Sequence, residues 1–106
     1  MAAEPELKTE AVDAVGHIVK TPGVVGGKAR IAGTRIRVMD VVVYYERSGW
    51  PVKRILQNYP SLTVADVHAA MAYYHDNRAE IEGEFEADER FEEEFRREHP
   101  GAVLDI

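Results

Sequence analysis

Glycine and proline are unevenly placed along this chain of 106 residues. They occur eight times between residues 22 and 60, whereas between residues 61 and 99 only Gly83 interrupts the sequence. Glycine favours turns because it adopts positive φ readily, and proline removes a backbone donor and fixes φ. Only short strands and helices therefore fit before residue 60, while the segment after it can be helical over most of its length.

Alternation of polar and apolar residues predicts short strands in the first half. The expected strands are His17-Ile18-Val19, Arg30-Ile31 and Arg35-Ile36-Arg37-Val38, the last two joined at Ala32-Gly33-Thr34. Before them, the apolar residues Leu7, Ala11 and Val15 are four positions apart. This spacing predicts a short N-terminal helix.

Three helices are predicted after the strands. Their expected limits are Met39 to Arg47, Pro51 to Asn58, and Thr63 to about Arg78. Thr63 and Asp66 have the spacing of a capping box, in which each side chain bonds the backbone N–H of the other. Beyond Arg78 the pattern fits either one continued helix or a second helix hinged at Gly83. Two short helices followed by a longer one form the outline of a helix-turn-helix domain.

The predicted fold class is therefore mainly α (α+β). Short N-terminal strands precede a three-helix, homeodomain-like or winged-helix-like helix-turn-helix, and a C-terminal acidic helix follows. The expected segments are an N-terminal extension (1–16), the strands with the helix-turn-helix domain (17–79), and an acidic amphipathic tail (80–106). The length fits one small folded domain.

The net charge of −6 hides a strongly polarised chain. Residues 17–60 carry eight basic and two acidic side chains, whereas residues 80–106 carry eleven acidic side chains and three arginines. Segments of opposite charge suggest two kinds of partner. The alternative is a soluble protein whose surface is merely unevenly charged.

Nucleic acid is the expected partner of the basic segment, because phosphates bind cations. The candidate DNA-binding residues are Lys28, Arg30, Arg35, Arg37, Lys53, Arg54 and His68. Arg35 and Arg37 lie on the same side of an extended chain, which is the geometry of a β-ribbon that reads DNA. The alternative is that these arginines are solvated on an edge strand, where they oppose aggregation.

The acidic segment carries an apolar stripe at helical spacing. The candidate partner-binding residues are Ile81, Phe85, Phe91, Phe95, Leu104 and Ile106. We expect the aromatic side chains to anchor the helix in a groove of a basic protein, while the glutamates complement its charge. The alternative is that the stripe packs within the same molecule or forms a homodimer.

Several kinds of chemistry have no support in the sequence. The absence of cysteine excludes a thiol nucleophile and cysteine-ligated metals, and it fits the reducing cytoplasm. The four histidines lack metal-ligand spacing, and Gly26-Gly27-Lys28 fits a plain turn better than a phosphate-binding loop. No apolar run approaches the ~18 residues that span a bilayer, and the N-terminus lacks the pattern of a signal peptide. We therefore expect a cytoplasmic protein that is not an enzyme and has no cofactor, metal or membrane association.

Three motifs carry a resemblance to a known family. Residues 22–28 read PGVVGGK, residues 31–36 read IAGTRI, and residues 55–63 read ILQNYPSLT, before an alanine-rich helix with Tyr73 and Tyr74. Together they resemble a bacterial and archaeal family of domains of unknown function, number 433 in its series, over roughly residues 17–78. In many members the second helix begins Ser-Pro-Glu-Glu, whereas here Trp50-Pro51-Val52-Lys53 stands in its place. The acidic tail is also longer than usual.

Members of that family resemble antitoxins of the VapB type. The resemblance implies a toxin partner with a PIN-like nuclease fold, an operator DNA and a homodimer. The leading hypothesis is an antitoxin that binds DNA through residues 17–78 and neutralises its toxin through residues 80–106. Two alternatives are a helix-turn-helix regulator without a toxin, and a protein-interaction adaptor that does not bind DNA.

Overall fold

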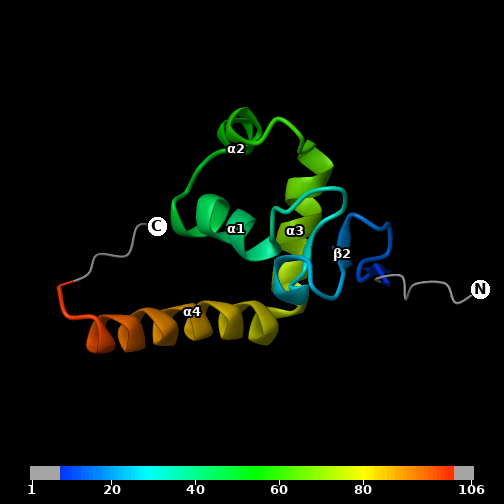
Figure 1. Cartoon of the computed structure of the whole chain (residues 1–106). Coiled ribbons are helices and arrows are strands. Elements are labelled where there is room, and N and C mark those ends of the chain that lie inside the picture. Colours follow the sequence, from blue (N-terminus) through cyan, green and yellow to red (C-terminus); the bar gives the residue numbers. More distant parts are fainter. Residues whose placement is uncertain (1–7, 102–106) are drawn as a thin grey trace, which may run out of the picture. The chain divides into compact units, whose positions relative to one another are not determined.

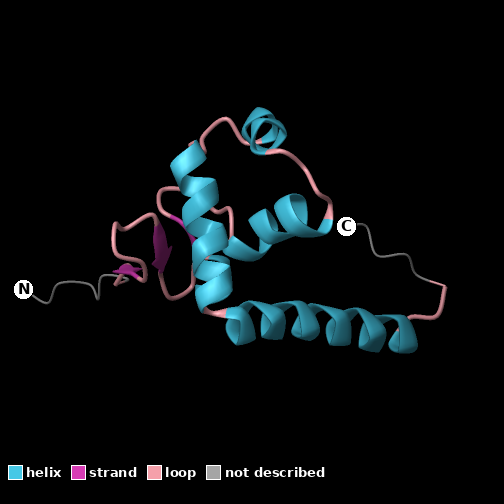
Figure 2. Ribbon diagram, turned by 180° about the vertical axis from the view of Figure 1, so that it is seen from behind, coloured by secondary structure: helices cyan, strands magenta, loops and turns pink. Residues whose placement is uncertain are grey.

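The computed structural model describes residues 8–101. The chain is mainly helical with a small antiparallel sheet near its N-terminal end, which confirms the predicted α+β class (Figure 1, Figure 2). It divides into two compact units between Asp76 and Asn77. The first unit holds the sheet and the first three α-helices, and the second holds one long helix.

Three short antiparallel strands form the sheet in the order β1-β2-β3. They are β1 (Glu10–Ala11), β2 (Ile18–Lys20) and β3 (Arg30–Ile31). The last two confirm the prediction, but β1 lies where a short helix was expected, and that expectation was wrong. The physical reason lies in the turn, where Asp13 accepts the N–H of Ile18 at 3.0 Å and Val12 donates to the carbonyl of Ile18 at 2.9 Å. These bonds favour a hairpin over a single helical turn.

The predicted strand over residues 35–38 was also wrong. Only an isolated bridge joins Arg37 to Arg30, and Ile31 donates to the carbonyl of Ile36 at 2.8 Å. The helix α1 (Val38–Val42) begins directly after Arg37. The carboxylate of Asp40 accepts the backbone N–H of Arg37 at 2.9 Å, so a helix start replaces the end of the strand.

The first predicted helix and the second are both present. Helix α1 continues into a π-helical turn, η2 (Val43–Arg47), in which Ser48 donates to the carbonyl of Val43 at 2.8 Å. Gly49 follows with φ of 67°, a conformation that glycine reaches without a steric penalty. Helix α2 (Val52–Asn58) then begins after Pro51, whose extended backbone forms the N-cap.

The third predicted helix is α3 (Val64–Asp76), and its capping box is confirmed. Thr63 donates its N–H to the Asp66 carboxylate at 2.9 Å, while Asp66 donates its N–H to the Thr63 hydroxyl at 3.1 Å. Helix α3 packs against α1, β2 and β3, and both views show it between α1 and the sheet (Figure 1, Figure 2). The fully buried side chains of this unit include Ile18, Ile31, Val38, Val41, Val42, Ile55 and Val67.

The second unit contains α4 (Arg78–Glu98). The helical path is broken at Asn77, where φ is −132° and ψ is 44°. Gly83 lies inside α4 and does not interrupt it. Neither alternative for the segment beyond Arg78 is fully correct, because α4 is a separate helix that begins after Asn77 and runs through Gly83 without a hinge. Among residues 8–101, no helix combines the length and the apolar character needed to cross a bilayer.

Candidate functional site

Arg30 was predicted to bind DNA, but the fold uses its side chain internally. The residue is only 9% exposed. Its guanidinium donates to the carbonyl of Thr34 at 2.9 Å and to the hydroxyl of Thr21 at 2.8 Å. The Thr21 hydroxyl is also 2.7 Å from that of Thr9, so the arginine ties β3 to the preceding turns. A guanidinium held in this way is not offered to a phosphate.

Two further predicted DNA contacts also have partners within the first unit. Arg37 forms a two-point ion pair with Asp40, with nitrogen–oxygen distances of 2.7 and 3.1 Å. The ammonium of Lys28 lies 3.9 Å from the sulfur of Met39. Since residues 35–38 form no strand, the predicted β-ribbon, with Arg35 and Arg37 side by side, is not present.

The remaining predicted DNA-binding residues are exposed. They are Arg35, Lys53, Arg54 and His68. Arg54 lies over the ring of Trp50, with its guanidinium carbon 4.0 Å from the ring centroid. Helix α2 contains two basic residues and no acidic residue, so its exposed side is positive.

An aromatic cluster that sequence reasoning missed supports this side of α2. Tyr44 stacks on Trp50 with ring centroids 4.7 Å apart, and the hydroxyl of Tyr59 donates to that of Tyr44 at 2.8 Å. Burial and then the bond with Tyr44 raise the pKa of Tyr59 to about 12, so its phenol stays neutral at physiological pH. The available signal was that two aromatic residues, Trp50 and Tyr59, flank the helix.

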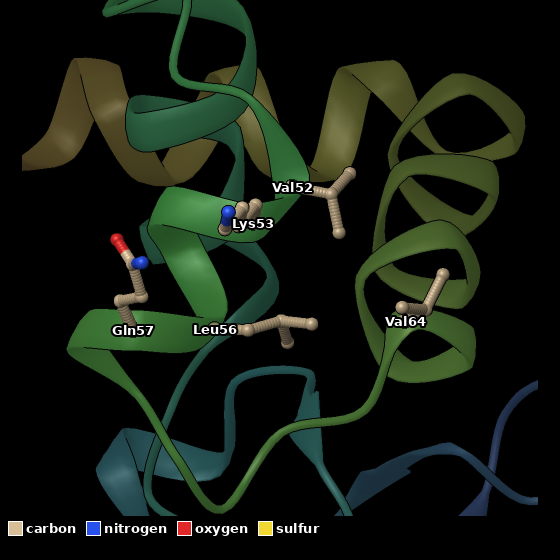
Figure 3. A pocket seen from close by; sticks show the side chains of 5 residues that line it. All are labelled: Val52, Lys53, Leu56, Gln57 and Val64. Atoms are coloured by element: carbon tan, nitrogen blue, oxygen red, sulfur yellow. The ribbon is translucent and has the colours of Figure 1, made fainter.

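An open apolar pocket of about 460 Å³ lies between α2 and the start of α3. It is lined by Val52, Lys53, Leu56, Gln57 and Val64. Figure 3 shows Val52 and Leu56 pointing from α2 toward the side where Val64 lies. Val64 is 50% exposed, although it is the first residue of a helix that packs in the core. The start of α3 is thus apolar at the point where a DNA-reading helix would need hydrogen-bonding groups.

Asp66, next to this pocket, is directed into the fold. Its carboxylate lies 3.0 Å from Nδ1 of His17, and its side chain is 15% exposed. Burial raises the pKa of the Asp66 carboxyl, but the hydrogen bonds with Thr63 and His17 outweigh this effect and hold the pKa below its ordinary value. Asp66 therefore connects the start of α3 to the residue before β2.

Helix α4 presents a different surface. It contains ten acidic residues and four arginines. Phe91 is 62% exposed, and its ring centroid is 6.4 Å from that of Phe95. Phe95 in turn stacks on His99 at 4.4 Å.

The other residues predicted to bind a partner divide into two groups. Ile81 and Phe85 are buried, whereas Leu104 and Ile106 lie outside the described residues. Within the described part of α4, the C-terminal half therefore carries the accessible aromatic surface.

Two further observations concern metal and phosphate binding. Within residues 8–101, no three acidic or histidine side chains are grouped so that they could hold a metal ion. In the turn η1 (Val25–Gly27), Gly27 donates to the carbonyl of Val24 and Lys28 to that of Val25. Two amides of this glycine-rich segment are thus used within the turn itself.

Comparisons place this geometry among known proteins. A family model described as "Protein of unknown function (DUF433)" matches residues 18–74. The chain is also similar to the crystal structure of a DUF433 member protein from Anabaena variabilis ATCC 29413, with 48% sequence identity and a TM-score of 0.61. That match covers 64% of this chain and 66% of the other, slightly less than two thirds of its length. No curated protein matches the chain.

Proposed function

We propose that this chain, which belongs to the DUF433 family of proteins of unknown function, is a non-catalytic antitoxin in the cytoplasm. In this proposal α4 captures a basic nuclease of PIN-like fold. The observation that carries the proposal is the exposure of Phe91 within the most acidic part of the chain. Burial of a large aromatic side chain by a partner contributes roughly 2 kcal/mol to the free energy of binding.

The charge of α4 indicates which partner would suit it. A nuclease binds polyanionic RNA, so cations flank its active site. An acidic helix with two neighbouring phenylalanines complements such a groove in charge and in apolar surface. Occupation of the groove by the helix would exclude RNA and inhibit the nuclease.

The experiment uses the full-length chain and the protein encoded beside its gene. Expression of that neighbour alone is expected to arrest growth, and co-expression of this chain to restore it. The double variant Phe91→Ser with Phe95→Ser is expected to lose the rescue. Val15→Ser is the matched control, because Val15 is 78% exposed in the first unit and should not contribute.

Two results would refute the antitoxin proposal. One is a neighbour that is harmless when expressed alone. The other is rescue that survives loss of both phenylalanines, with the variant expressed at the wild-type level.

DNA binding by the first unit is a second candidate function. It is favoured by the exposure of Arg35, Lys53 and Arg54 and by the absence of acidic residues from α2. Fluorescence anisotropy with a duplex from the chain's own promoter would test it, since log affinity should fall linearly with log salt. Simultaneous replacement of the three cations by alanine should flatten that slope. If the protein did not bind DNA at low salt, this second candidate function would be refuted.

A further inference from the structure

The first unit has an apolar surface that its own elements leave open. Helix α2 has seven residues, and only Ile55 is buried. Val52 and Leu56 of the same helix are partly exposed at the pocket, where Val64 is half exposed. Exposed apolar patches rimmed by polar side chains are typical of docking sites. Lys53 and Gln57 form that rim here.

The chain also contains a helix whose chemistry complements this pocket. Among the described residues, four large hydrophobic side chains are exposed: Val15, Tyr45, Val64 and Phe91. Of these, Val64 lies in the pocket and Phe91 lies on α4. The pocket lies on a helix with two cations and no acid, whereas α4 contains ten acids and four arginines. Amphipathic helices bind apolar grooves in this way, with complementary charges along the rim.

We propose that α4 of a second copy of this chain occupies the pocket between α2 and α3, with Phe91 as its anchor. The exchange is reciprocal, so each copy donates α4 and receives its partner's. A reciprocal exchange has two-fold symmetry and closes on itself, giving a dimer and not an open chain of molecules.

The backbone supports an exchange of this kind. Helix α4 has 21 residues, which correspond to roughly 30 Å at 1.5 Å per residue. The break at Asn77 separates it from the last helix of the first unit. Phe91 lies in the second half of α4, so the anchor is more than three helical turns away from that break. Each contact is a single helix in a shallow pocket, and we expect a dissociation constant of roughly micromolar order.

Sedimentation velocity of the full-length protein over a range of concentrations tests the proposal. The wild type is expected to change reversibly from monomer to dimer. Val64→Glu should raise the dissociation constant at least about tenfold, because it places an acid in the pocket that receives acidic α4. An acid is tolerated in the first turn of a helix, so this variant should still fold. Ala65→Glu is the matched control, since it adds the same charge at an exposed neighbour that does not line the pocket.

A mixing experiment separates this interface from other dimers. Val64→Glu keeps an intact α4, and Phe91→Ser keeps an intact pocket, so each alone should be largely monomeric. An equimolar mixture should recover a heterodimer through one sound contact. A mixture that stays monomeric would overturn the reciprocal exchange. So would a wild type that remains monomeric, or Ala65→Glu weakening the dimer as much as Val64→Glu.

This inference does not depend on the antitoxin proposal. Val64→Glu should lose the dimer and still rescue growth, because its α4 is unchanged. Failure of self-association with retained rescue would refute only the exchange, while a dimer without any effect on the neighbouring gene product would refute only the antitoxin.

Discussion

The two units of this chain differ in which of their side chains are buried and which are exposed. In the first unit, part of the positive charge of residues 17–60 is used inside the fold, where Arg30 bonds Thr21 and Arg37 pairs with Asp40. In the second unit, Phe91 is exposed among acids. A cation near a turn finds carbonyl and hydroxyl acceptors within a few residues, whereas α4 buries Ile81 and Phe85 in its first half and leaves Phe91 in its second half exposed. Charge density along the sequence therefore overestimates the number of exposed cations in the first unit.

The comparison can be tested most strongly at Arg30. Arg30→Ala should destabilise the first unit by about 3 kcal/mol, because buried hydrogen bonds to Thr21 and Thr34 are lost along with the packing of the stem. Arg35→Ala, which removes an exposed cation nearby, should change stability by less than about 0.5 kcal/mol. Urea unfolding of both variants measures the difference. Equal effects would mean that burial does not distinguish the two arginines.

Asp66 should give the next largest effect. Asp66→Asn removes the carboxylate that accepts the backbone N–H of Thr63 and lies beside His17. The substitution should lower the free energy of unfolding by about 1 kcal/mol at pH 7. Because the pKa of Asp66 is lower in the folded state, its contribution is complete above its ordinary pKa of 3.8 and is lost as pH falls through the folded value.

Thermal unfolding between pH 7 and pH 2 can test this pH dependence. The wild type should lose stability below about pH 4, and Asp66→Asn should lose less over the same range. Parallel curves for the two proteins would contradict the assignment of this titration to Asp66.

In the second unit, Gly83 should respond in the opposite direction. Gly83→Ala should stabilise α4 by about 1 kcal/mol, because alanine is the better helix former. A Cβ at this position meets no atom within 4 Å, so the substitution introduces no clash. The measurement is circular dichroism during heating, in which the variant should retain more helical signal than the wild type. If it retained less, the position would need glycine for a reason other than its backbone.

The smallest effect is expected at Glu92. Its carboxylate lies 3.9 Å from the guanidinium of Arg96, whose side chain is 63% exposed. Exposed pairs of this kind contribute about 0.3 kcal/mol. Glu92→Gln should therefore change the stability of α4 by no more than that, and only at low salt. A larger loss would indicate that this side of the helix is not solvated.

Local sequence signals predicted the elements that local bonds determine. The start of α2 and the Thr63–Asp66 capping box need only neighbouring residues. Helix α2 begins at Val52, one residue after the predicted Pro51, and the capping box is confirmed. The predicted strand at residues 35–38 failed because Asp40, outside the alternating pattern, begins a helix there.

The candidate surfaces were less predictable than the helices. Arg30 and Arg35 are the same residue type in the sequence, but in the fold Arg30 is buried and donates to Thr21 and Thr34, whereas Arg35 is exposed. The pocket depends on α2 and α3 meeting at Val52 and Val64, and helical periodicity in the sequence does not show which apolar residues remain open. In α4, by contrast, exposure of Phe91 is compatible with its predicted place on the helix.

The break at Asn77 also bears on how such a chain can evolve. The family model ends at residue 74, just before the break, so the shared pattern lies within the first unit. Beyond Phe85, the described residues of α4 are not buried, and substitutions there meet few packing constraints. Mutations can therefore accumulate in this half of the helix while the inherited domain keeps its core. A small protein built in this way can change the surface of its second unit without first losing stability.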